Sequence, residues 1–490
     1  SFCTLLGGKN RTVRPRPSSV ICASRKPSAQ HHAMACVRSA AASLVFTLLL
    51  AAIAAAQSGA VNSTNTVNFC MLQQFSQNSA TGDFHARFAV KHYASQFPGL
   101  TYTWETYAID GNRNFSTAIA ALLSMPDTCT FLVGPGTSRF SIAVSPLVSR
   151  PWLGATASST SLSDKQAHKW FTRSIPSDAY GGAGVAALVL HFGWRRVNVI
   201  CSDEPYGVSL VAGFTTAYAD HGAIDTATCF PIVSPDADAA AWRNALAQTR
   251  ERSKSKVIVI AHGEPGDVFV DAVVSLGMQR THIFVLGEIC DQRSPNVTTK
   301  LTGALCASYA VSDSAAAFNA LYAARNATGD RQRVADLGLY SAINYTASGV
   351  YDFLYVDLVK HAMAATHQQF LRNGSHLEAA VPDNFVPIMD NVRATRTNGF
   401  TGTVVLNSRG DRESATIAFI NLQPGIGAHK FATWTPNNGT TQRSTGQLYW
   451  LASGFRDVPA AVDVTSNEVP VAIVIGALCG SVVLLLLAVM

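Results

Sequence analysis

The stretch Trp170-Phe-Thr-Arg-Ser-Ile-Pro-Ser-Asp-Ala-Tyr180 continues through His191-Phe-Gly-Trp-Arg-Arg-Val-Asn-Val-Ile200 to Pro205-Tyr-Gly207, and it decides the fold class. Pro176-Ser-Asp178 supplies oxygen side chains that cap a helix, and the apolar, small-residue run from Tyr180 to Phe192 predicts that helix, which Gly193 ends. Val197 to Cys201 is β-branched and apolar, as expected for a strand covered on both faces. This order indicates one step of an open parallel sheet, with Asp178 and Tyr206 in loops where such sheets bind ligands.

Shorter motifs accompany this block along residues 67–457. They are Leu132-Val-Gly-Pro-Gly-Thr-Ser138, Gly154-Ala-Thr-Ala157 with Leu162-Ser-Asp-Lys165, Tyr351-Asp352, Gly399-Phe-Thr-Gly-Thr-Val404 and Gly410-Asp-Arg412. Together they resemble the receptor family ligand-binding region, the bilobed extracellular module of class C G-protein-coupled receptors and natriuretic-peptide receptor cyclases. The resemblance implies an α/β fold of the type I periplasmic-binding-protein kind, in which a multi-strand hinge joins two doubly wound parallel sheets. A transmembrane helix is expected to follow.

The alternation of strands and helices predicts two lobes. In lobe 1 we expect strands at 67–73, 101–107 and 130–133 and helices at 83–97 and 115–124. In lobe 2 we expect strands near Arg196, Ala227, Val257 and His282. A long helix ending near His361 should return to lobe 1, and a hairpin over 401–422 to lobe 2. Lobe 1 then covers about 67–168 plus 335–395, and lobe 2 about 169–334 plus 396–457.

The N-terminal part has the pattern of a secretory signal peptide over residues 34–56. Met34-Ala-Cys-Val-Arg38 is basic, residues 40–56 are apolar, and Ala54-Ala-Ala56 fits a cleavage site. Residues 1–33 form an upstream extension to which we assign no structural role, with a transit peptide as the alternative reading. Seven of the 37 Lys and Arg residues lie before the cleavage site, which leaves 30 against 31 acidic residues. The remaining chain is nearly neutral, and nothing in it indicates a nucleic-acid partner.

The C-terminal 22 residues, 469–490, carry no charge and are long enough to cross a hydrocarbon core of about 30 Å. We expect a transmembrane helix here rather than a buried core helix, because only Ser481 would provide a polar face. Gly476 and Gly480 share one face of that helix, a spacing that permits close helix contact. Residues 57–468 are then extracellular and the protein is single-pass as given, in the plasma membrane. We expect a cytoplasmic part to follow.

Asparagine and cysteine usage fits an extracellular glycoprotein. Seven Asn-x-Ser/Thr sequons lie in residues 57–468, at Asn62, Asn114, Asn296, Asn326, Asn344, Asn373 and Asn438. Six cysteines allow 15 pairings by arithmetic. We pair Cys70 with Cys129 and Cys201 with Cys229, which join neighbouring strands of one lobe, and Cys290 with Cys306, which closes a short loop. No His/Cys spacing indicates zinc, and we expect no metal and no cofactor.

The expected ligand site lies in loops at the carboxyl ends of strands. Gly134-Pro-Gly-Thr-Ser138 can hold an anionic group through its backbone and the Thr137 and Ser138 hydroxyls, or it is only a tight turn with a cap. The 155–161 loop adds hydroxyls, including Ser158. By resemblance to amino-acid-sensing relatives, Thr156 holds the α-amino end of a ligand, Asp178 assists it and Tyr206 covers it. Asp178 serves equally well as a helix cap alone.

Three departures from those relatives leave the ligand open. The 154–164 loop is about two residues longer, Arg139 replaces a small hydroxyl residue, and Ile289 replaces an acid that Glu288 offers one residue early. Arg139 suits an anionic ligand through bidentate pairing, or is simply solvated. We therefore expect a small polar ligand, most simply one with a carboxylate, that is amino-acid-like. We add Arg139 and Glu288 to the candidate ligand-binding residues.

Two other classes of protein share parts of this pattern. A hydrolase would need a Gly-x-Ser-x-Gly elbow or a His-Glu-x-x-His helix, and neither occurs; only His262 and Glu264 form a conceivable acid–base pair. A soluble or membrane-anchored transport-type binding protein fits the lobes, although the soluble form does not fit residues 469–490. The resemblance favours a non-enzymatic receptor that forms a homo- or heterodimer through lobe 1 and signals to a seven-helix domain, a cyclase or a kinase. Ligand-induced lobe closure would carry the signal.

Overall fold

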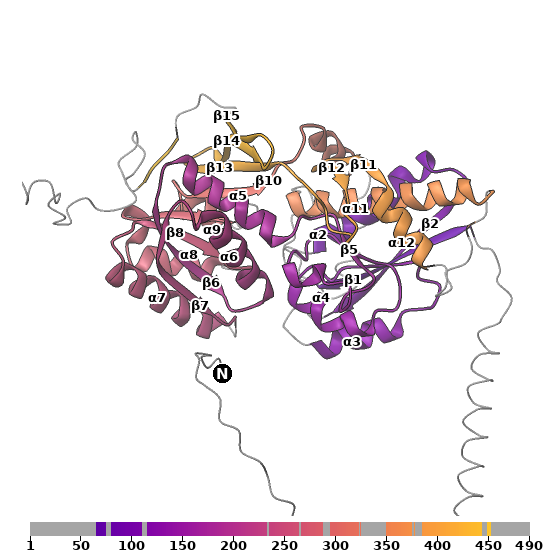
Figure 1. Cartoon of the computed structure of the whole chain (residues 1–490), viewed down its shortest axis with the longest axis horizontal. Coiled ribbons are helices and arrows are strands. Elements are labelled where there is room, and N and C mark those ends of the chain that lie inside the picture. Colours follow the sequence, from indigo (N-terminus) through magenta and orange to yellow (C-terminus); the bar gives the residue numbers. More distant parts are fainter. Residues whose placement is uncertain are drawn as a thin grey trace, which may run out of the picture. The chain divides into compact units, whose positions relative to one another are not determined.

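The computed structural model describes residues 65–74, 80–109, 115–232, 235–263, 266–287, 295–322, 324, 349–374, 377, 385–442 and 448–451. The extension 1–33, the expected signal peptide 34–56 and the expected membrane span 469–490 lie outside these ranges. Within them, the structure contains no helix that combines the length and the apolar character needed to span a membrane. The described chain is organised around two separate sheets (Figure 1).

The first sheet is wholly parallel. Its order is β2-β1-β3-β4-β5, built from β1 (Thr66–Gln74), β2 (Thr101–Ile109), β3 (Phe131–Val133), β4 (Trp152–Gly154) and β5 (Phe171–Arg173). Between the strands run α2 (Ala80–Tyr93), the 3-10 turn η1 (Ala94–Gln96), α3 (Phe115–Ser124), α4 (Ser138–Val144) and the short turns η2 (Ser145–Leu147) and η3 (Thr160–Ser163). We refer to this sheet and the helices packed on it as lobe 1.

Helices cover both faces of the first sheet. Because successive side chains of β1 point to opposite faces, β1 contributes to two different cores. Phe69 and Met71 belong to a core that includes residues of α2 and of the long helix α11 (Val350–Arg372). Cys70 and Leu72 face the opposite core, together with residues of α3 and α4. The helix α12 (Phe385–Ala394) lies against α11. This is the doubly wound arrangement that the sequence predicts for lobe 1.

The second sheet has eight strands in the order β15-β14-β13-β10-β9-β8-β6-β7. Its parallel part consists of β6 (Arg196–Ser202), β7 (Ala223–Phe230), β8 (Val257–Ala261), β9 (Ile283–Leu286) and β10 (Leu305–Tyr309). The antiparallel part consists of β13 (Ile417–Gln423), β14 (Gly427–Thr435) and β15 (Gly439–Gln442). This sheet and its helices form lobe 2. The four strands predicted near Arg196, Ala227, Val257 and His282 are β6 to β9 and run parallel as expected, and the antiparallel strands extend the sheet beyond β10.

The helices of lobe 2 also cover both faces of their sheet. Val197 and Val199 of β6 share a core with α5 (Asp178–His191) and α6 (Pro205–Tyr218), whereas Ile200 packs with α7 (Pro235–Arg252) and α8 (Gly266–Ser275). The 3-10 turn η4 (Met278–Arg280) and the helix α9 (Pro295–Lys300) complete the lobe. The helical segment at 314–322 packs instead on lobe 1, where the Phe318 ring contacts those of Phe88 in α2 and Phe353 in α11. α5 lies very close to α6, because a Cβ on Gly182 would come within 2.3 Å of the Phe214 nitrogen. The small residues predicted to permit close packing do so here.

Three local expectations need correction. The predicted 401–422 hairpin forms only around its turn at residues 407–411, where Leu406 and Arg412 make an antiparallel bridge. Beyond the turn, β12 (Gly402–Val405) pairs with β11 (Arg396–Gly399) in a two-stranded sheet, and β13 joins lobe 2. The long helix does not end near His361; α11 continues to Arg372, since its residues stay apolar or buried on the face toward lobe 1. Tyr206 is not in a loop. Pro205 starts α6, so Tyr206 occupies the first helical turn.

Two of the three predicted disulfides are present. Cys70 of β1 is bonded to Cys129, 59 residues later and just before β3, and Cys201 of β6 is bonded to Cys229, its direct partner in the register with β7. Cys306 is disulfide-bonded, but its predicted partner Cys290 lies outside the described residues, so that pairing stays a prediction.

Only some of the sequons can be placed. Asn373 and Asn438 are exposed at the surface, as glycosylation requires. The other five fall where side chains are not described: Asn62, Asn114, Asn296, Asn326 and Asn344.

Candidate ligand-binding site

The turn after β3 and the loop after β4 are tied to each other by Ser138. The Ser138 hydroxyl oxygen accepts the backbone N–H groups of Ser158, at 3.1 Å, and of Ser159, at 3.0 Å. Ser138 and Ser158 are buried, with 4% and 1% of their surface exposed. The hydroxyl of Ser138, which the sequence offers to a ligand, therefore holds the neighbouring loop in place.

Thr156 lies half-buried beside the turn at residues 134–138. Its hydroxyl donates to the Gly136 carbonyl oxygen at 2.7 Å, and it is also hydrogen-bonded to the hydroxyl of Tyr355 in α11. Burial raises the pKa of Tyr355 to about 12, so this tyrosine stays protonated. A Cβ on Gly136 would meet both hydroxyls, at 3.0 and 3.1 Å. Thr137, also half-buried, flanks this cluster at the start of α4.

Arg139 points its guanidinium toward aromatic rings. Its central carbon is 5.8 Å from the ring centre of Phe115 and 5.5 Å from that of Phe140, both within cation–π range. The buried Nε makes no hydrogen bond to any residue that the structure describes. Arg139 is half-buried and lies where α3 and α4 begin, next to the ends of β2 and β3. Its charge is thus available at the carboxyl edge of the first sheet.

Asp178, the first residue of α5, is buried between the two lobes, with 1% of its surface exposed. Its backbone N–H donates to the Ser158 carbonyl oxygen at 2.8 Å, and its carboxylate accepts hydrogen bonds from the hydroxyls of Ser209 and Ser158. Burial raises the pKa of Asp178 to about 6, and the two serine hydrogen bonds and the Arg173 charge oppose that rise. Asp178 thereby connects the loop after β4 with α6 of lobe 2.

Tyr206 is the half-buried aromatic side chain of the lobe 2 wall. It packs on a small cluster of Cys201, Leu210 and Ala261 at the carboxyl ends of β6 and β8. Cβ atoms on Gly263 and Gly287 would lie 3.5 and 3.7 Å from its ring carbon Cδ1 and its hydroxyl oxygen, respectively. Glu288, the remaining candidate, lies outside the described residues.

Sequence reasoning missed Arg173, the last residue of β5. Arg173 is fully buried, and its Nε is 2.8 Å from Oδ1 of Asp411, 238 residues further along the chain. Its guanidinium also donates to the Ser159 carbonyl at 2.8 Å, to the Ala157 carbonyl at 3.4 Å and to the Ser163 hydroxyl at 2.7 Å. Arg173 therefore fixes the loop that carries Thr156 and Ser158. An arginine at the end of a short, otherwise apolar strand was the available signal.

A second buried arginine, Arg412, holds the neighbouring crossing between the lobes. It donates to the Ser174 carbonyl at 2.9 Å and to the Thr401 carbonyl at 2.7 Å. Asp357 of α11 lies beside it and accepts the N–H groups of Phe400 and Thr401, at 2.7 and 2.8 Å. Burial lowers the pKa of Arg412, and the Asp357 charge opposes this. The two crossings near residues 173 and 412 are thus hydrogen-bonded into one buried network.

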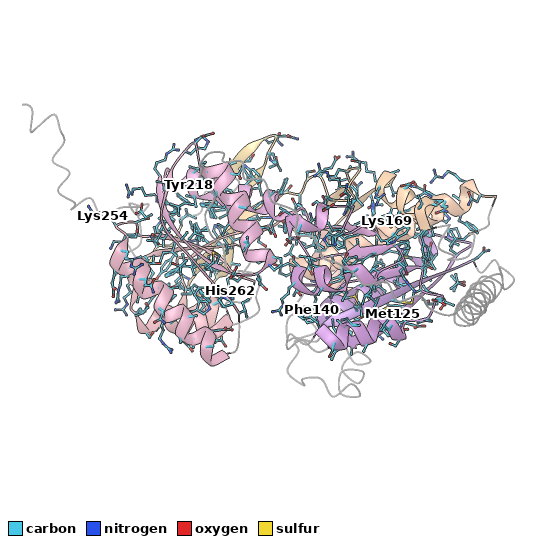
Figure 2. The ribbon with its side chains drawn as sticks, turned by 60° about the horizontal axis from the view of Figure 1, so that its bottom comes forward. Met125, Phe140, Lys169, Tyr218, Lys254 and His262 are labelled. Atoms are coloured by element: carbon cyan, nitrogen blue, oxygen red, sulfur yellow. A yellow bond between two sulfur atoms is a disulfide. The ribbon has the colours of Figure 1, made fainter. Side chains whose placement is uncertain are left out.

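Of the two residues named for enzymatic catalysis, only His262 falls within the described chain. His262 lies in lobe 2 (Figure 2) and is buried. Its ring centre is 4.9 Å from that of Trp242 and 5.6 Å from that of Phe230. Glu264, its conceivable partner, lies outside the described residues. His262 thus has the surroundings of a core histidine.

A family model described as the receptor family ligand binding region matches residues 85–425. The metabotropic glutamate receptor 8 of Homo sapiens is 24% identical over 141 residues, which are 25% of this chain and 16% of that receptor. The G-protein coupled receptor family C group 6 member A of Carassius auratus is 30% identical over 108 residues, which are 21% of this chain and 12% of that receptor. The matched stretch spans less than a fifth of either receptor.

Proposed function

The chain belongs to the family defined by the receptor family ligand binding region, and on this premise we propose that it binds a small polar ligand between its lobes as a cell-surface receptor. The observation that carries the proposal is the position of Asp178. It joins Ser158 of the loop after β4 to Ser209 of α6, so the two walls of the proposed site meet at a predicted ligand residue. A ligand that competes for these groups changes the contact between the lobes.

We propose that the ligand is amino-acid-like and carries a carboxylate. Thr156 and the turn at Gly136 present half-buried polar groups on lobe 1, and Tyr206 presents an aromatic face on lobe 2. Arg139 supplies a cation whose Nε has no hydrogen bond among the described residues. A guanidinium and a carboxylate match each other in geometry. Thr137 and Glu288 stay in the proposal as flanking polar groups.

Signalling would follow from a difference in ligand affinity between lobe arrangements. A ligand that contacts both Thr156 and Tyr206 binds best when the lobes are close, and it shifts the population toward that arrangement. The receptors named above are G-protein-coupled or glutamate receptors by name, which supports a receptor role rather than an enzymatic one. We propose that the expected span at 469–490 places residues 57–468 outside the cell.

We also propose that two chains pair through lobe 1. The helix α3 has an apolar sequence without charges, and Leu123 on it is 73% exposed. An exposed leucine on an uncharged helix is suited to contact with another protein surface. Sedimentation of the purified chain tests this proposal: we expect a dimer that Leu123→Glu converts to monomer, and a monomeric wild-type chain would overturn the proposal.

Isothermal titration calorimetry of the purified full chain tests the ligand proposal. We expect saturable heat from at least one probe among the twenty amino acids and short dicarboxylic acids. Thr156→Val and Tyr206→Ala should each weaken binding at least tenfold, whereas Tyr206→Phe keeps the aromatic face and should retain most of it. Thr216→Val, a solvent-exposed position on α6, is the matched control. Absence of heat from every probe would contradict the proposal.

A further inference from the structure

The amino edge of the second sheet gathers positive charge. β9, β8 and β6 are neighbouring parallel strands, so the segments that lead into them lie at the same edge of lobe 2. Three acidic residues lie there, Asp220, Asp225 and Glu251. The same segments carry seven Lys and Arg residues, which we call the basic edge: Arg195 and Arg196 at β6, Arg250, Arg252, Lys254 and Lys256 before β8, and Arg280 before β9.

Three cations of the basic edge are open to a partner. The side chains of Arg252, Lys254 and Arg280 are exposed, and they make no hydrogen bond or ion pair within the part of the chain that the structure describes. Figure 2 shows Lys254 at the surface of lobe 2. The protein itself therefore leaves these three charges uncompensated.

Two further arginines of the basic edge keep their charge as well. Arg195 and Arg250 donate to backbone carbonyl oxygens at 2.9 and 3.2 Å, which satisfies hydrogen bonds without neutralising the guanidinium. Arg196 differs, because its Nη2 is 2.7 Å from Oδ1 of Asp225. Although residues 57–490 are nearly neutral, this one edge thus presents a local excess of positive charge.

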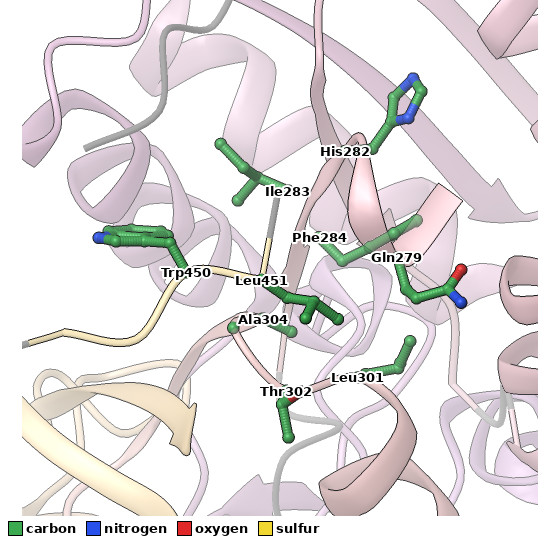
Figure 3. Close-up of a pocket in the computed structure, with 10 residues that line it drawn as sticks. Gln279, His282, Ile283, Phe284, Leu301, Thr302, Ala304, Trp450 and Leu451 are labelled. Carbon is green, nitrogen blue, oxygen red and sulfur yellow. The ribbon is translucent and has the colours of Figure 1, made fainter. Parts of the chain in front are cut away.

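The positive charge of the basic edge acts on His282, the residue before β9. His282 is 4% exposed. Burial lowers its pKa to about 4, and the charges of Lys256 and Arg250 also lower it. Figure 3 shows His282 and Gln279 lining a small pocket at this edge. The cations that surround His282 are therefore close enough together to act as one charged surface.

The carboxyl edge of the same sheet has the opposite charge. Asp203 and Glu204 follow β6, and Asp267 lies at the start of α8, after β8. In the described residues that directly follow the five parallel strands, neither lysine nor arginine occurs. The proposed ligand site lies on this side of the sheet. A large polyanion is therefore attracted to the amino edge and repelled from the carboxyl edge.

We propose that the basic edge of lobe 2 binds a sulfated polysaccharide. Its cations precede three neighbouring strands, so they form a row about 10 Å long at the level of the backbone. Such a row matches the regularly repeated charges of a linear polymer. Five of the seven cations are arginines, whose planar guanidinium groups each pair with two oxygens of one anionic group.

The location of the chain favours a polysaccharide over other polyanions. If residues 57–468 lie outside the cell, as proposed, the basic edge meets neither cellular nucleic acid nor the cytoplasmic leaflet, which carries the anionic lipids. Sulfated polysaccharides of the cell surface and matrix are the polyanions on that side. This inference goes beyond the proposed ligand and shares with it only the extracellular location.

Surface plasmon resonance of the purified full chain on immobilised heparin tests the proposal. At an ionic strength of about 0.15 M we expect saturable binding, which about 1 M salt should abolish because the screening length falls from about 8 Å to about 3 Å. Arg252→Ala/Lys254→Ala/Arg280→Ala should weaken binding at least about tenfold. Lys91→Ala/Arg396→Ala/Arg409→Ala, which removes three exposed charges elsewhere, is the matched control and should stay within about twofold.

Desulfated heparin, a DNA duplex and phosphatidylserine vesicles complete the experiment. We expect desulfated heparin not to bind, and the other two probes to bind more weakly than heparin. Equal binding of heparin by the two triple variants, or equal binding of heparin and desulfated heparin by the wild type, would overturn the proposal. Tighter binding of DNA or vesicles than of heparin would overturn the choice of a polysaccharide.

The test is independent of the amino-acid-like ligand. The basic edge lies at the opposite end of the strands from Asp178 and Tyr206, so Arg252→Ala/Lys254→Ala/Arg280→Ala should keep the calorimetric response of the wild type. Heparin binding by a chain that binds no amino acid would leave this inference standing and remove the proposed ligand. The reverse result would remove only this inference.

Discussion

Removing the guanidinium of Arg173 should destabilise the protein more than most single substitutions, because it breaks a buried ion pair. Arg173 has no exposed side-chain surface, and the Asp411 side chain is only 9% exposed. Removing one partner of such a pair costs about 3–5 kcal/mol, since the other charge remains buried. Three further acceptors, on Ala157, Ser159 and Ser163, also lose their donor. We therefore expect Arg173→Ala to lower the free energy of unfolding by about 4–5 kcal/mol.

Substitutions of Asp411 and a conservative substitution of Arg173 test the same ion pair. Asp411→Asn keeps an oxygen that accepts from the arginine, so it should cost less, about 1–3 kcal/mol. Arg173→Lys keeps the charge but cannot reach four acceptors at once, and it should fall between wild type and Arg173→Ala. In the double variant Arg173→Ala/Asp411→Asn the losses should not add, with a coupling of at least about 1 kcal/mol.

Urea unfolding at pH 7 measures these differences, and hydrogen exchange locates them. In Arg173→Ala, amides of the 155–163 loop should exchange faster at urea concentrations where the rest of lobe 1 stays protected. Arg393→Ala serves as a control, because Arg393 forms its ion pair with an exposed aspartate, Asp390. A loss of less than about 1 kcal/mol in Arg173→Ala, or strictly additive losses in the double variant, would refute the reasoning.

Four further predictions concern single groups. The folded protein binds the Asp178 proton more tightly than the unfolded chain does, because burial raises its pKa from 3.8 to about 6, so the free energy of unfolding should fall as pH rises from about 4 to 6. In urea titrations, Asp178→Asn should gain up to about 3 kcal/mol on the wild type between pH 4 and pH 7. Burial lowers the pKa of His361 to about 4, so stability that is present above pH 6.5 is lost as pH falls toward 4. In thermal unfolding scans, the melting temperature of His361→Gln should fall less than that of the wild type over this pH range. Replacing Cys201 and Cys229 by alanine should cost roughly 2–4 kcal/mol, with retention of the far-ultraviolet circular dichroism spectrum, because the bond closes a loop of 28 residues. Trp450 is 2% exposed and packs on two aromatic rings of lobe 2, so Trp450→Ala should lower the free energy of unfolding by about 3–5 kcal/mol, and an unchanged urea midpoint would contradict that packing.

Local patterns predicted much of the fold. The helix α5 and the strand β6 fall within two residues of their expected positions, and Gly193, with φ of +72°, follows the helix as expected. These elements are readable because a small-residue helix and a β-branched run each have a short-range signature. The predicted cap is not made, because Ser177 forms no side-chain cap hydrogen bond and the Asp178 carboxylate bonds to serines instead. The pairs Cys70–Cys129 and Cys201–Cys229 followed from neighbouring strands for the same reason.

Partners that are distant in the sequence could not be predicted in this way. β13 pairs with β10 across more than 100 residues, which no local pattern reveals, and this pairing adds an antiparallel extension to the second sheet. The contact between Arg173 and Asp411, which are 238 residues apart in the sequence, was not predicted for the same reason. Such contacts depend on how the lobes cross each other, and the sequence gives only the residues at each crossing.

The sequence predicted which kinds of residue gather at the candidate site better than it predicted what those residues bind. Hydroxyl groups do gather at the carboxyl edge of the first sheet, but the structure engages those of Ser138 and Ser158 with the protein itself. Tyr355 of α11 also bonds to Thr156, and this contact was not predicted because α11 has the sequence of an apolar helix. A buried hydroxyl must find a partner, and the sequence alone does not say whether that partner is a ligand or the chain.

The distance between the lobes, measured with and without ligand, tests the central claim most directly. Fluorophores placed by unnatural amino acids at the exposed positions Lys91 of lobe 1 and Lys254 of lobe 2 report that distance in the full chain by energy transfer. With a probe that calorimetry shows to bind, we predict a saturable change in transfer in the wild type, with a midpoint at the calorimetric Kd, and no change in Tyr206→Ala at the same concentrations. Saturable binding of the probe with unchanged transfer in the wild type would contradict the account.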